Sequence, residues 1–374
     1  MRILHLHDSF DPGGKSARAV RLMNAWGDAA RHVVVSAAPD ALGARDGIAK
    51  GVRYEIAQDP PPLAGKPSVA RYEAIARAMS GFDLVLTYGW GAIDGVMARR
   101  VFAKGLAPLV HHEDGFGEEE AGGLKLERNL YRRIALSAAH ALAVPSEMLE
   151  NIALKAWKQP AGRVRRIHTG IATAAYARDP DPKAIPGLKR REGEVVIGAV
   201  SPLQPLKQLP ALVRACGGLS DRFRLVIVGE GPDRAAIEGA AEAMGIADRL
   251  VMAGRVDRPY RFLRLFDMIA LSSRAEQFPT IVLEAMAAGL PVASLPVGDV
   301  RRMVSAENQP FIAEYPTEVR LRDVIQALVS DAGLRRVVGD ANRAKAVAEY
   351  DEALMIARYR SLYEEALGRP GALA

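Results

Sequence analysis

Two glutamates, Glu276 and Glu284, stand with seven residues between them in a segment suited to binding a phosphorylated ligand. Glu276 follows an apolar run typical of a strand, and Glu284 falls inside the helix expected over 280–288. A carboxylate at a strand's carboxyl end can point into a ligand site. A second one in the next helix can bond ligand hydroxyls while loop N–H groups face phosphate oxygens. The spacing by itself is weak evidence, because most such glutamates are solvated.

A second candidate is the loop after the first apolar run, where Gly13, Gly14, Lys15 and Ser16 lead into a helix. Glycines let backbone N–H groups approach an anion, and the start of a helix adds partial positive charge. The loop is nearly a Walker A motif, but Ser9 occupies the first glycine position. A tight turn without a ligand and a phosphate-binding loop are equal alternatives at this point.

The elements that must position these residues alternate between short β-branched runs and amphipathic stretches, as in βαβ units around a parallel sheet. Expected strands are 3–6, 32–36, 52–56, 84–87, 108–111, 141–144, 195–200, 225–228, 250–253, 268–271 and 291–294. Expected helices are 16–26, 69–79, 93–102, 124–140, 208–216, 234–244, 260–266 and 280–288. The sequence therefore predicts an α/β fold with two doubly wound parallel-sheet, Rossmann-like domains facing a central cleft.

The domain boundaries follow from a change of composition over 178–194, which is rich in proline and charge and has no apolar period. We expect a first domain over 1–177, a linker over 178–194 and a second domain over 195–349. In the helix over 124–140, the basic residues are expected to form a solvated face in preference to a membrane-surface face.

Composition excludes several classes of protein. With 374 residues, 49% of them apolar, the chain can bury a large core, and no apolar run approaches the ~20 residues that cross a bilayer. The single cysteine, Cys216, excludes an internal disulfide and a multi-thiolate metal site, and its apolar setting indicates a buried side chain. The net charge of +6 is spread along the chain, which argues against a nucleic-acid partner and is compatible with an anionic substrate or a membrane surface.

Taken together, the motifs resemble those of the retaining glycosyltransferases of family four, which have the two-Rossmann GT-B fold. The resemblance covers most of the chain. In the second half it rests on Glu276 and Glu284 and on the segments 228–232, 253–256 and 297–299, which read VGEGP, AGRV and VGD. In the first half it rests on Gly13-Gly14 before a helix and on Val144-Pro145-Ser146 at the end of a strand.

The resemblance implies a UDP- or GDP-sugar donor held mainly by the second domain, and a carbohydrate or lipid-linked acceptor held mainly by the first. It places Glu284 on the ribose hydroxyls and Glu276 beside the donor sugar at the reacting face. The donor-binding residues it implies are Gly13, Gly14, Lys15, Lys207, Gly229, Gly231, Arg255, Arg274, Phe278, Pro279, Thr280 and Glu284. It further implies that a carboxy-terminal helix over 350–374 packs back on the first domain.

Two positions depart from the family pattern. Family members usually offer the diphosphate an arginine and a lysine; here Lys207 fits, but Pro202 stands at the arginine position. Losing one preorganised donor to a leaving group typically costs about 10²–10³ in rate. Either Lys207, loop N–H groups and another basic residue such as Arg274 compensate, or activity is weak. The second departure is Arg302, where many members have a glutamate.

Further catalytic candidates lie in the loop after the expected strand over 108–111. Relatives place a functional histidine in this loop, and the position falls on His111, His112 or a substitution by Asp114. A histidine whose pKa lies near neutrality could bond a donor-sugar hydroxyl or accept the acceptor's proton. His111 could equally be a core residue at the strand end, whereas His112 and Asp114 are expected to face the cleft.

No metal site is predicted. Asp179 and Asp181 form an Asp-x-Asp pair, but they lie in the proline-rich linker, where solvated charge is the better interpretation. His111, His112 and Glu113 lack a supporting set of ligands at recognisable spacing. We therefore expect sugar transfer without a metal or other cofactor.

The leading hypothesis is a retaining hexosyltransferase that acts in bacterial envelope glycolipid or polysaccharide synthesis. Because Ile3 enters a strand without a signal-peptide pattern, we expect a cytoplasmic protein, one that could contact anionic lipid at the cytoplasmic face of the inner membrane. The alternatives are a nucleotide-sugar epimerase or hydrolase of the same fold, a P-loop nucleotide-binding protein built on Lys15, and a non-catalytic sensor suggested by Pro202.

Overall fold

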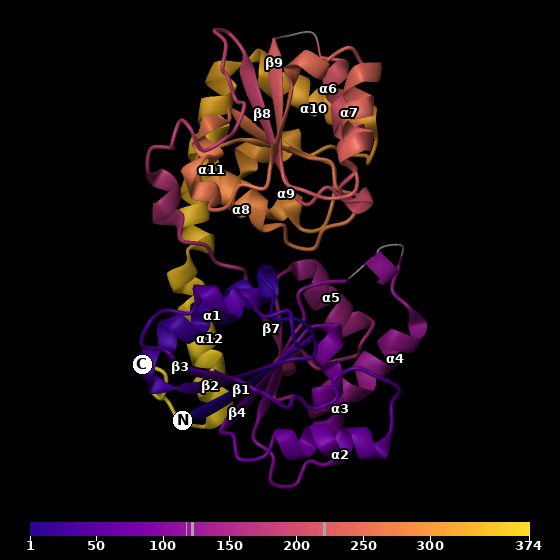
Figure 1. Cartoon of the computed structure of the whole chain (residues 1–374), viewed down its shortest axis with the longest axis vertical. Coiled ribbons are helices and arrows are strands. Elements are labelled where there is room, and N and C mark those ends of the chain that lie inside the picture. The colour runs from indigo at the N-terminus through magenta and orange to yellow at the C-terminus, as the bar shows by residue number, and fades with distance from the viewer. Residues whose placement is uncertain (117, 121–122, 220–221) are drawn as a thin grey trace. The chain divides into compact units, whose positions relative to one another are not determined.

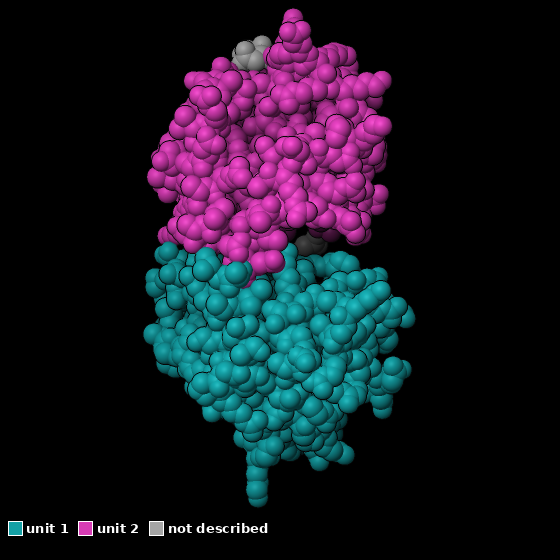
Figure 2. Space-filling model, turned by 90° about the vertical axis from the view of Figure 1, so that its left-hand side faces the viewer, with its two compact units in different colours: residues 1–169, 353–374 teal, residues 170–352 magenta. Residues whose placement is uncertain are grey.

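The computed structural model describes residues 1–116, 118–120, 123–219 and 222–374. The chain divides into two compact units (Figure 2). Unit 1 comprises Met1–Thr169 and Ala353–Ala374, and unit 2 comprises Gly170–Glu352. Within the described residues, no helix has both the length and the apolar character needed to cross a membrane.

Unit 1 is built on a seven-stranded parallel sheet with the strand order β3-β2-β1-β4-β5-β6-β7 (Figure 1). The strands are β1 (Arg2–His7), β2 (Arg31–Ser36), β3 (Arg53–Ile56), β4 (Leu84–Tyr88), β5 (Leu109–His112), β6 (Ala141–Val144) and β7 (Val164–Arg166). The direction of strand order reverses between β1 and β4. The carboxyl ends of these two strands are therefore the topological switch point, where doubly wound sheets bind ligands.

The helices of unit 1 begin and end as their local sequence dictates. They are α1 (Gly14–Trp26), α2 (Val69–Ala78), α3 (Ile93–Val101), α4 (Leu126–Ala135), α5 (Glu147–Lys155) and α12 (Glu352–Leu367), the last belonging to unit 1 from residue 353 onward. Ser68 and Ser146 cap α2 and α5 by accepting a hydrogen bond from a first-turn N–H, as serine does at this position. Tyr359 and Tyr363 of α12 are buried in the core against the sheet strands.

The middle of this sheet carries a polar core of stacked rings. His7 and Tyr88 stack with ring centroids 4.1 Å apart, and Tyr88 and His112 stack at 4.6 Å. One nitrogen of His5 lies 3.1 Å from the Tyr88 hydroxyl, and the other lies 3.0 Å from His32. Burial is the largest cause that lowers the pKa of each of these histidines, to about 3 for His7 and about 4 for His32. The rings are therefore neutral in the folded unit at neutral pH.

Unit 2 is built on a five-stranded parallel sheet with the order β10-β9-β8-β11-β12. The strands are β8 (Val195–Val200), β9 (Phe223–Val228), β10 (Leu250–Gly254), β11 (Met268–Leu271) and β12 (Val292–Ser294). The helices are α6 (Leu209–Gly217), α7 (Arg234–Ala243), α8 (Thr280–Ala287), α9 (Val300–Met303), α10 (Glu318–Ser330) and α11 (Ala332–Tyr350). Here the switch point lies between β8 and β11. The two parallel α/β sheets confirm the predicted fold class.

The segment predicted as a linker, 178–194, is part of unit 2 in the structure. Ile185 is buried in the core of unit 2, and Arg190 Nη2 bonds both carboxylate oxygens of Asp267 at 2.8 and 2.9 Å. Glu194 accepts two hydrogen bonds of 3.0 Å from the buried Arg224. The charges that suggested a solvated linker therefore attach this segment to the unit, and the division of the chain falls at Thr169/Gly170.

Some expected elements differ from the observed ones. The helix expected over 260–266 is two 3₁₀ turns, Pro259–Arg261 and Leu263–Leu265, which a proline at the start and a left-handed Arg258 before it favour. The helix expected over 124–140 begins at Leu126 and passes into a 3₁₀ turn after Ala135. Cys216 lies in α6 and is buried, as its apolar setting predicted.

Candidate functional site

A charged pair occupies the switch point of unit 2. Glu276, in the loop after β11, accepts hydrogen bonds at Oε1 from Lys207 Nζ at 2.6 Å and from Ser273 Oγ at 2.7 Å. The Lys207 and Glu276 side chains are only 17% and 14% exposed. The sequence-predicted cation and carboxylate are thus brought together at the carboxyl ends of two adjacent strands.

Backbone contacts hold the two loops that carry this pair. Ser272 Oγ donates to the carbonyl oxygen of Lys207 at 2.8 Å, and the Arg274 N–H donates to the carbonyl oxygen of Leu206 at 2.9 Å. The side chain of Arg274 itself is exposed. The loop after β11 and the segment after β8 therefore position one another.

The predicted donor-binding glycines Gly229 and Gly231 have a packing role in this site. Both have φ near +150°, and a Cβ would lie 1.9 Å from the Ser201 carbonyl oxygen at Gly229 and 2.4 Å from the Leu203 carbonyl oxygen at Gly231. Only glycine allows this approach. The two glycines therefore fix the segment that leads to Lys207.

Glu284 lies in α8, the helix that comes directly after the Glu276 loop in the sequence. It is half-buried and accepts a hydrogen bond from the Tyr176 hydroxyl at 2.9 Å. Pro279 is buried at the N-cap position of α8, and Thr280 is its first residue. The ring of Phe278 lies 5.9 Å from that of Tyr350. The loop over 276–280 is thus anchored at both ends.

Other basic candidates of unit 2 lie at its surface. Arg255 is exposed, and its Nε bonds Asp257 at 3.0 Å. Pro202 is exposed at the position where the family pattern has an arginine, and Arg302 lies 3.9 Å from Asp299. Within the described part of unit 2, Lys207 is therefore the candidate cation that contacts Glu276.

Gly298 shapes the Glu276 loop, and its replacement is a direct test of that loop. Its φ is +50°, and a Cβ would lie 2.5 Å from the Glu276 carbonyl oxygen. We expect Gly298→Ala to displace Glu276 and to lower kcat/KM for the sugar transfer that the resemblance implies by up to about 10²-fold, the scale of a ~1 Å misplacement. Gly245→Ala is the matched control, because Gly245 also has a positive φ of +67° but open space around it. Equal activity losses in the two variants would contradict a positioning role.

In unit 1, Asp8 and Lys15 form an ion pair at the end of β1. Lys15 Nζ donates to both carboxylate oxygens of Asp8, at 2.9 and 3.1 Å. Gly91 lies against the same carboxylate, because a Cβ there would lie 2.2 Å from the Asp8 Cβ. By contrast, the space around a Cβ on Gly14 is open, and Gly13 has an extended backbone. Lys15 is thus paired within the protein, while Gly13 and Gly14 leave their backbone open to a ligand.

Asp114 follows β5 and forms a two-contact ion pair with Arg18 of α1. Arg18 Nη2 lies 2.8 Å from Asp114 Oδ2, and Arg18 Nη1 bonds Oδ1. Burial acts to raise the pKa of Asp114, but the Arg18 charge and hydrogen bonds outweigh it and hold that pKa below its usual value. Asp114 is therefore an ionised carboxylate that Arg18 already engages.

The two histidine candidates lie in the core of unit 1. His112, which we expected to face the cleft, is fully buried; its nitrogens lie 3.1 Å from the Thr87 carbonyl oxygen and 2.7 Å from the Tyr363 hydroxyl. His111 is also fully buried, with Nδ1 2.7 Å from Thr87 Oγ1. Burial, and then the charge of Arg132, lowers the pKa of His111 to about 3. The expectation for His112 is corrected, because neither of its nitrogens is available to a substrate.

A pocket of about 670 Å³ opens at the switch point of unit 1. Its volume lies within the range of small-molecule sites. Apolar walls come from Leu63, Trp90, Ile93 and Tyr131, and carboxylates come from Asp8 and Asp94. The Asp94 carboxylate bonds Arg71 and the Tyr131 hydroxyl. The pocket therefore offers apolar surface with a few polar groups.

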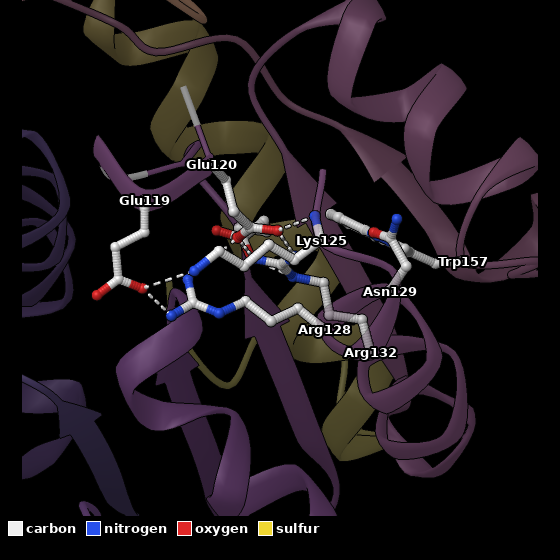
Figure 3. A network of polar contacts seen from close by, with 8 residues as sticks. Glu119, Glu120, Lys125, Arg128, Asn129, Arg132 and Trp157 are labelled. Atoms are coloured by element: carbon white, nitrogen blue, oxygen red, sulfur yellow. Dashed lines mark hydrogen bonds and ion pairs between the residues drawn. The ribbon is translucent and has the colours of Figure 1, made fainter. Parts of the chain in front are cut away.

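A buried ion network is centred on Arg132 of α4, the helix that also supplies the pocket residues Arg128 and Tyr131 (Figure 3). Arg132 is 1% exposed, and its Nη1 and Nη2 donate to the two carboxylate oxygens of Glu120 at 3.0 and 2.8 Å. Its Nε lies 3.5 Å from Glu113 Oε2. Burial, opposed by Arg132, raises the pKa of Glu113 to about 7. The guanidinium also lies about 5 Å from three rings, those of Trp90, Phe116 and Trp157.

This network corrects the expectation of a solvated basic face on α4 for Arg128 and Arg132, whereas Lys125 and Arg133 are exposed as expected. Arg128 bonds Glu119 and lies 3.3 Å from Glu120, so it too turns inward with 19% exposure. Sequence reasoning missed Arg18 and Arg132 because arginine within an amphipathic helix usually faces solvent. The sequence did carry a signal for such a network, because the basic and the apolar residues of α4 fall on two separate stripes of the helix. Periodicity alone, however, does not tell which of the two stripes is buried.

Asp179 and Asp181 are engaged by arginines of unit 2. Arg261 Nη2 lies 2.6 Å from Asp181 Oδ2, and Arg264 Nη1 lies 3.4 Å from Asp179 Oδ1. Across the described ranges, no group of three or more histidine, cysteine, aspartate or glutamate side chains could hold a metal ion. Metal independence stays a prediction.

Two parallel α/β sheets, each in its own unit and one of them with a Lys–Glu pair at its switch point, define a protein with two domains of the Rossmann type. The family model "Glycosyl transferases group 1" matches residues 181–345, and the model "Glycosyltransferase Family 4" matches residues 12–175. The chain belongs to the family-four glycosyltransferases with the GT-B fold. This confirms the family that the motifs indicated.

Individual relatives are distant. An N-acetyl-α-D-glucosaminyl L-malate synthase of Bacillus anthracis is 24% identical over 178 residues, 47% of either chain. A D-inositol 3-phosphate glycosyltransferase of Catenulispora acidiphila is 26% identical over 325 residues, 79% of this chain and 76% of the relative. The chain spans less than half the length of the first three curated relatives that it matches.

Solved structures share the fold across nearly the whole chain. The crystal structure of Anabaena HepE in complex with UDP has a TM-score of 0.79 at 19% identity, covering 98% of this chain and 100% of that one. A sucrose-phosphate synthase from Thermosynechococcus elongatus has a TM-score of 0.77 at 19% identity, with the same coverage. Both are evidence for the fold.

Proposed function

We propose that the protein transfers a sugar from a nucleotide-sugar donor, UDP-linked by preference, to a hydroxyl acceptor with retention of anomeric configuration. The observation that carries the proposal is the Lys207–Glu276 pair at the switch point of unit 2, followed by Glu284 in α8. A cation there can stabilise a departing diphosphate, and a carboxylate can bond sugar or ribose hydroxyls. UDP complexes of fold neighbours such as HepE support a uridine nucleotide.

The chemistry proposed is departure and attack on the same face of the donor sugar. The bond between the anomeric carbon and the diphosphate oxygen breaks, the bond to the acceptor oxygen forms, and the acceptor proton passes to the leaving diphosphate. Lys207 offsets the charge that develops on the diphosphate. No metal or other cofactor enters this scheme.

The acceptor is proposed to bind in the unit 1 pocket. Its apolar walls favour an acceptor that carries an apolar portion, such as a lipid-linked sugar, in bacterial envelope synthesis. Asp8, at the pocket wall, can accept a hydrogen bond from an acceptor hydroxyl. Its location at a switch point supports a ligand role. We place the protein in the cytoplasm, with contact to the inner face of the membrane.

A thermal-shift panel tests the donor assignment without an acceptor. UDP-, GDP- and ADP-sugars, ATP and GTP are each added with magnesium or with EDTA; a ligand at 100 times its dissociation constant adds about 2.7 kcal/mol of stability. We expect one nucleotide sugar to stabilise the protein equally in both conditions, and Glu284→Ala to abolish that shift. Glu238→Ala, which alters a surface glutamate of α7, should retain it.

Stabilisation only by ATP or GTP with magnesium, lost in Lys15→Ala, would refute the donor assignment in favour of a P-loop protein. A donor that binds and then releases free sugar or an interconverted nucleotide sugar as sole products would instead indicate a hydrolase or epimerase. If the protein binds a donor tightly but forms no product with any acceptor offered, the result would indicate a sensor.

A further inference from the structure

The outward face of α4 is apolar. Leu126, Leu130 and Ile134 recur every four residues, which places them on one side of the helix, and they are 85%, 56% and 40% exposed. We call these three side chains the α4 ridge. Large aliphatic side chains gathered on one exposed helix face mark an interaction site more often than scattered ones do.

The ridge follows from the buried arginine network. Arg132 is drawn into the core by Glu120 and Glu113, and Arg128 bonds Glu119 and Glu120. Because these charged side chains occupy the inner side of α4, its aliphatic residues are turned outward. Several ion pairs on the inner side of α4 thus fix which side of the helix faces outward.

Basic residues flank the ridge. Lys125 precedes the helix and Arg133 lies on it, and both are exposed. Arg100, also exposed, bonds Ser137 Oγ at 2.7 Å, in the turn directly after α4. Glu127 is the one exposed acidic residue of the helix itself. Glu119, which is also exposed, lies 3.9 Å from Lys125 Nζ and bonds Arg128. The described surroundings of the ridge therefore carry the exposed basic residues Lys125, Arg133 and Arg100 against the exposed acidic residues Glu119 and Glu127, which leaves a net positive charge.

We propose that the α4 ridge docks unit 1 on an anionic lipid surface. Three aliphatic side chains provide on the order of 300 Å² of apolar surface, well below the roughly 800 Å² that each partner of a stable protein interface buries. An apolar helix face with a basic border is, in contrast, the arrangement that lies in the interface of anionic bilayers. A lipid surface is thus the occupant that both size and charge favour.

The position of the ridge bears on the acceptor, and this step rests on the proposed function. Glu127, Arg128 and Tyr131 of the same helix line the unit 1 pocket. An acceptor whose polar head enters the pocket could therefore keep its apolar chain in the bilayer beside α4. Docking would present a lipid-linked acceptor directly to the pocket.

Vesicle co-sedimentation of the full chain tests the proposal. The probes are vesicles of phosphatidylglycerol and phosphatidylcholine in equal parts, and of phosphatidylcholine alone. We expect binding to the anionic vesicles that weakens with added salt. The triple variant Leu126→Ser/Leu130→Ser/Ile134→Ser should lower the partition coefficient at least about 10-fold, and Arg133→Gln about 5-fold on anionic vesicles.

The matched control is Val319→Ser/Val337→Ser/Val347→Ser, which removes three valines of unit 2 with exposures of 55%, 55% and 53%. It should bind vesicles as the parent does. Since the ridge side chains are exposed, the triple variant should keep the parent's unfolding temperature and its nucleotide-sugar shift, which separates this proposal from the donor assignment.

Three outcomes would overturn the docking role. The first is vesicle binding unchanged in the ridge variant, and the second is no binding by the parent protein. The third is a concentration-dependent dimer that the ridge variant abolishes while vesicles bind neither protein, because the ridge would then contact a second copy of the chain.

Discussion

Replacing Lys207 by methionine is expected to lower kcat for sugar transfer by about 10²–10³-fold, the usual cost of removing one preorganised donor to a developing charge. Pro202 stands where the family has its second cation, and Arg274 and Arg255 are exposed, whereas Lys207 contacts the Glu276 carboxylate at 2.6 Å. Methionine keeps the length of the aliphatic stem while it removes the ammonium group. The loss should therefore appear in turnover rather than in folding.

The measurement is steady-state kinetics with the donor that the thermal-shift panel selects. Lys207→Arg should recover part of the rate because it keeps the charge, and Lys183→Met, at an exposed site of the same unit, should behave as the parent. A Lys207→Met protein with more than a tenth of parental kcat would show that another group stabilises the diphosphate. Arg274→Met then identifies whether that group is Arg274.

Unit 1 is expected to unfold on acidification between about pH 6 and pH 4, before unit 2. Its five buried histidines, His5, His7, His32, His111 and His112, all have pKa values lowered by burial. An unfolded histidine titrates near 6.5, so below that pH the unfolded chain binds more protons and stability falls. Each histidine contributes a slope of about 1.4 kcal/mol per pH unit until its folded pKa is reached.

Two other groups affect the same transition. Glu113, with its pKa raised to about 7, binds a proton in the folded unit first and so offsets one histidine between about pH 7 and pH 4.5. Asp114 and Glu120 have lowered pKa values, so their stabilisation is lost only as the pH falls below the values of free carboxyls. The histidines therefore dominate the range from pH 6 to 4.5.

Tryptophan fluorescence follows this transition directly. All three tryptophans, Trp26, Trp90 and Trp157, and all seven histidines of the chain lie in unit 1. His7→Phe removes one titrating ring whose two nitrogens make no hydrogen bond, and an aromatic ring keeps the stacking with Tyr88. We expect it to shift the acid midpoint to lower pH. His140→Phe, at an exposed position, should leave the midpoint in place, and identical midpoints in all three proteins would contradict this account.

Much of the fold was predictable because parallel strands buried on both faces give continuous apolar runs, such as those over 195–200 and 268–271. The helices α5, α10 and α11 were not predicted. The strand β7 was not predicted either, because three residues are too few to show a distinct period. The segment over 178–194 was misjudged because ion pairs to Arg224 and Asp267 cannot be seen in composition.

The candidate site was predictable where a motif carries it and not where packing decides. The loop after β11 brings Glu276 to Lys207, two residues that the family motifs singled out, and their roles toward a donor stay predictions. His112 was expected to face the cleft, but the side chain of a residue at the end of a strand can point to either face of the sheet. In the structure, its ring contacts the hydroxyl of Tyr363, which is 251 positions away in the sequence. Partners this distant in sequence cannot be deduced from spacing.

The Arg132 network also constrains how such a protein can change its specificity. Breaking a buried ion pair by removing one partner typically costs 3–5 kcal/mol, roughly a third or more of a domain's stability. Single substitutions at Glu113, Glu120 or Arg132 are therefore poor intermediates for evolution or for design. A loop grafted after β5 to reshape the unit 1 pocket must carry Glu113 and Glu120 together with a helix that supplies Arg132. The unit to exchange is therefore the loop and α4 as one piece.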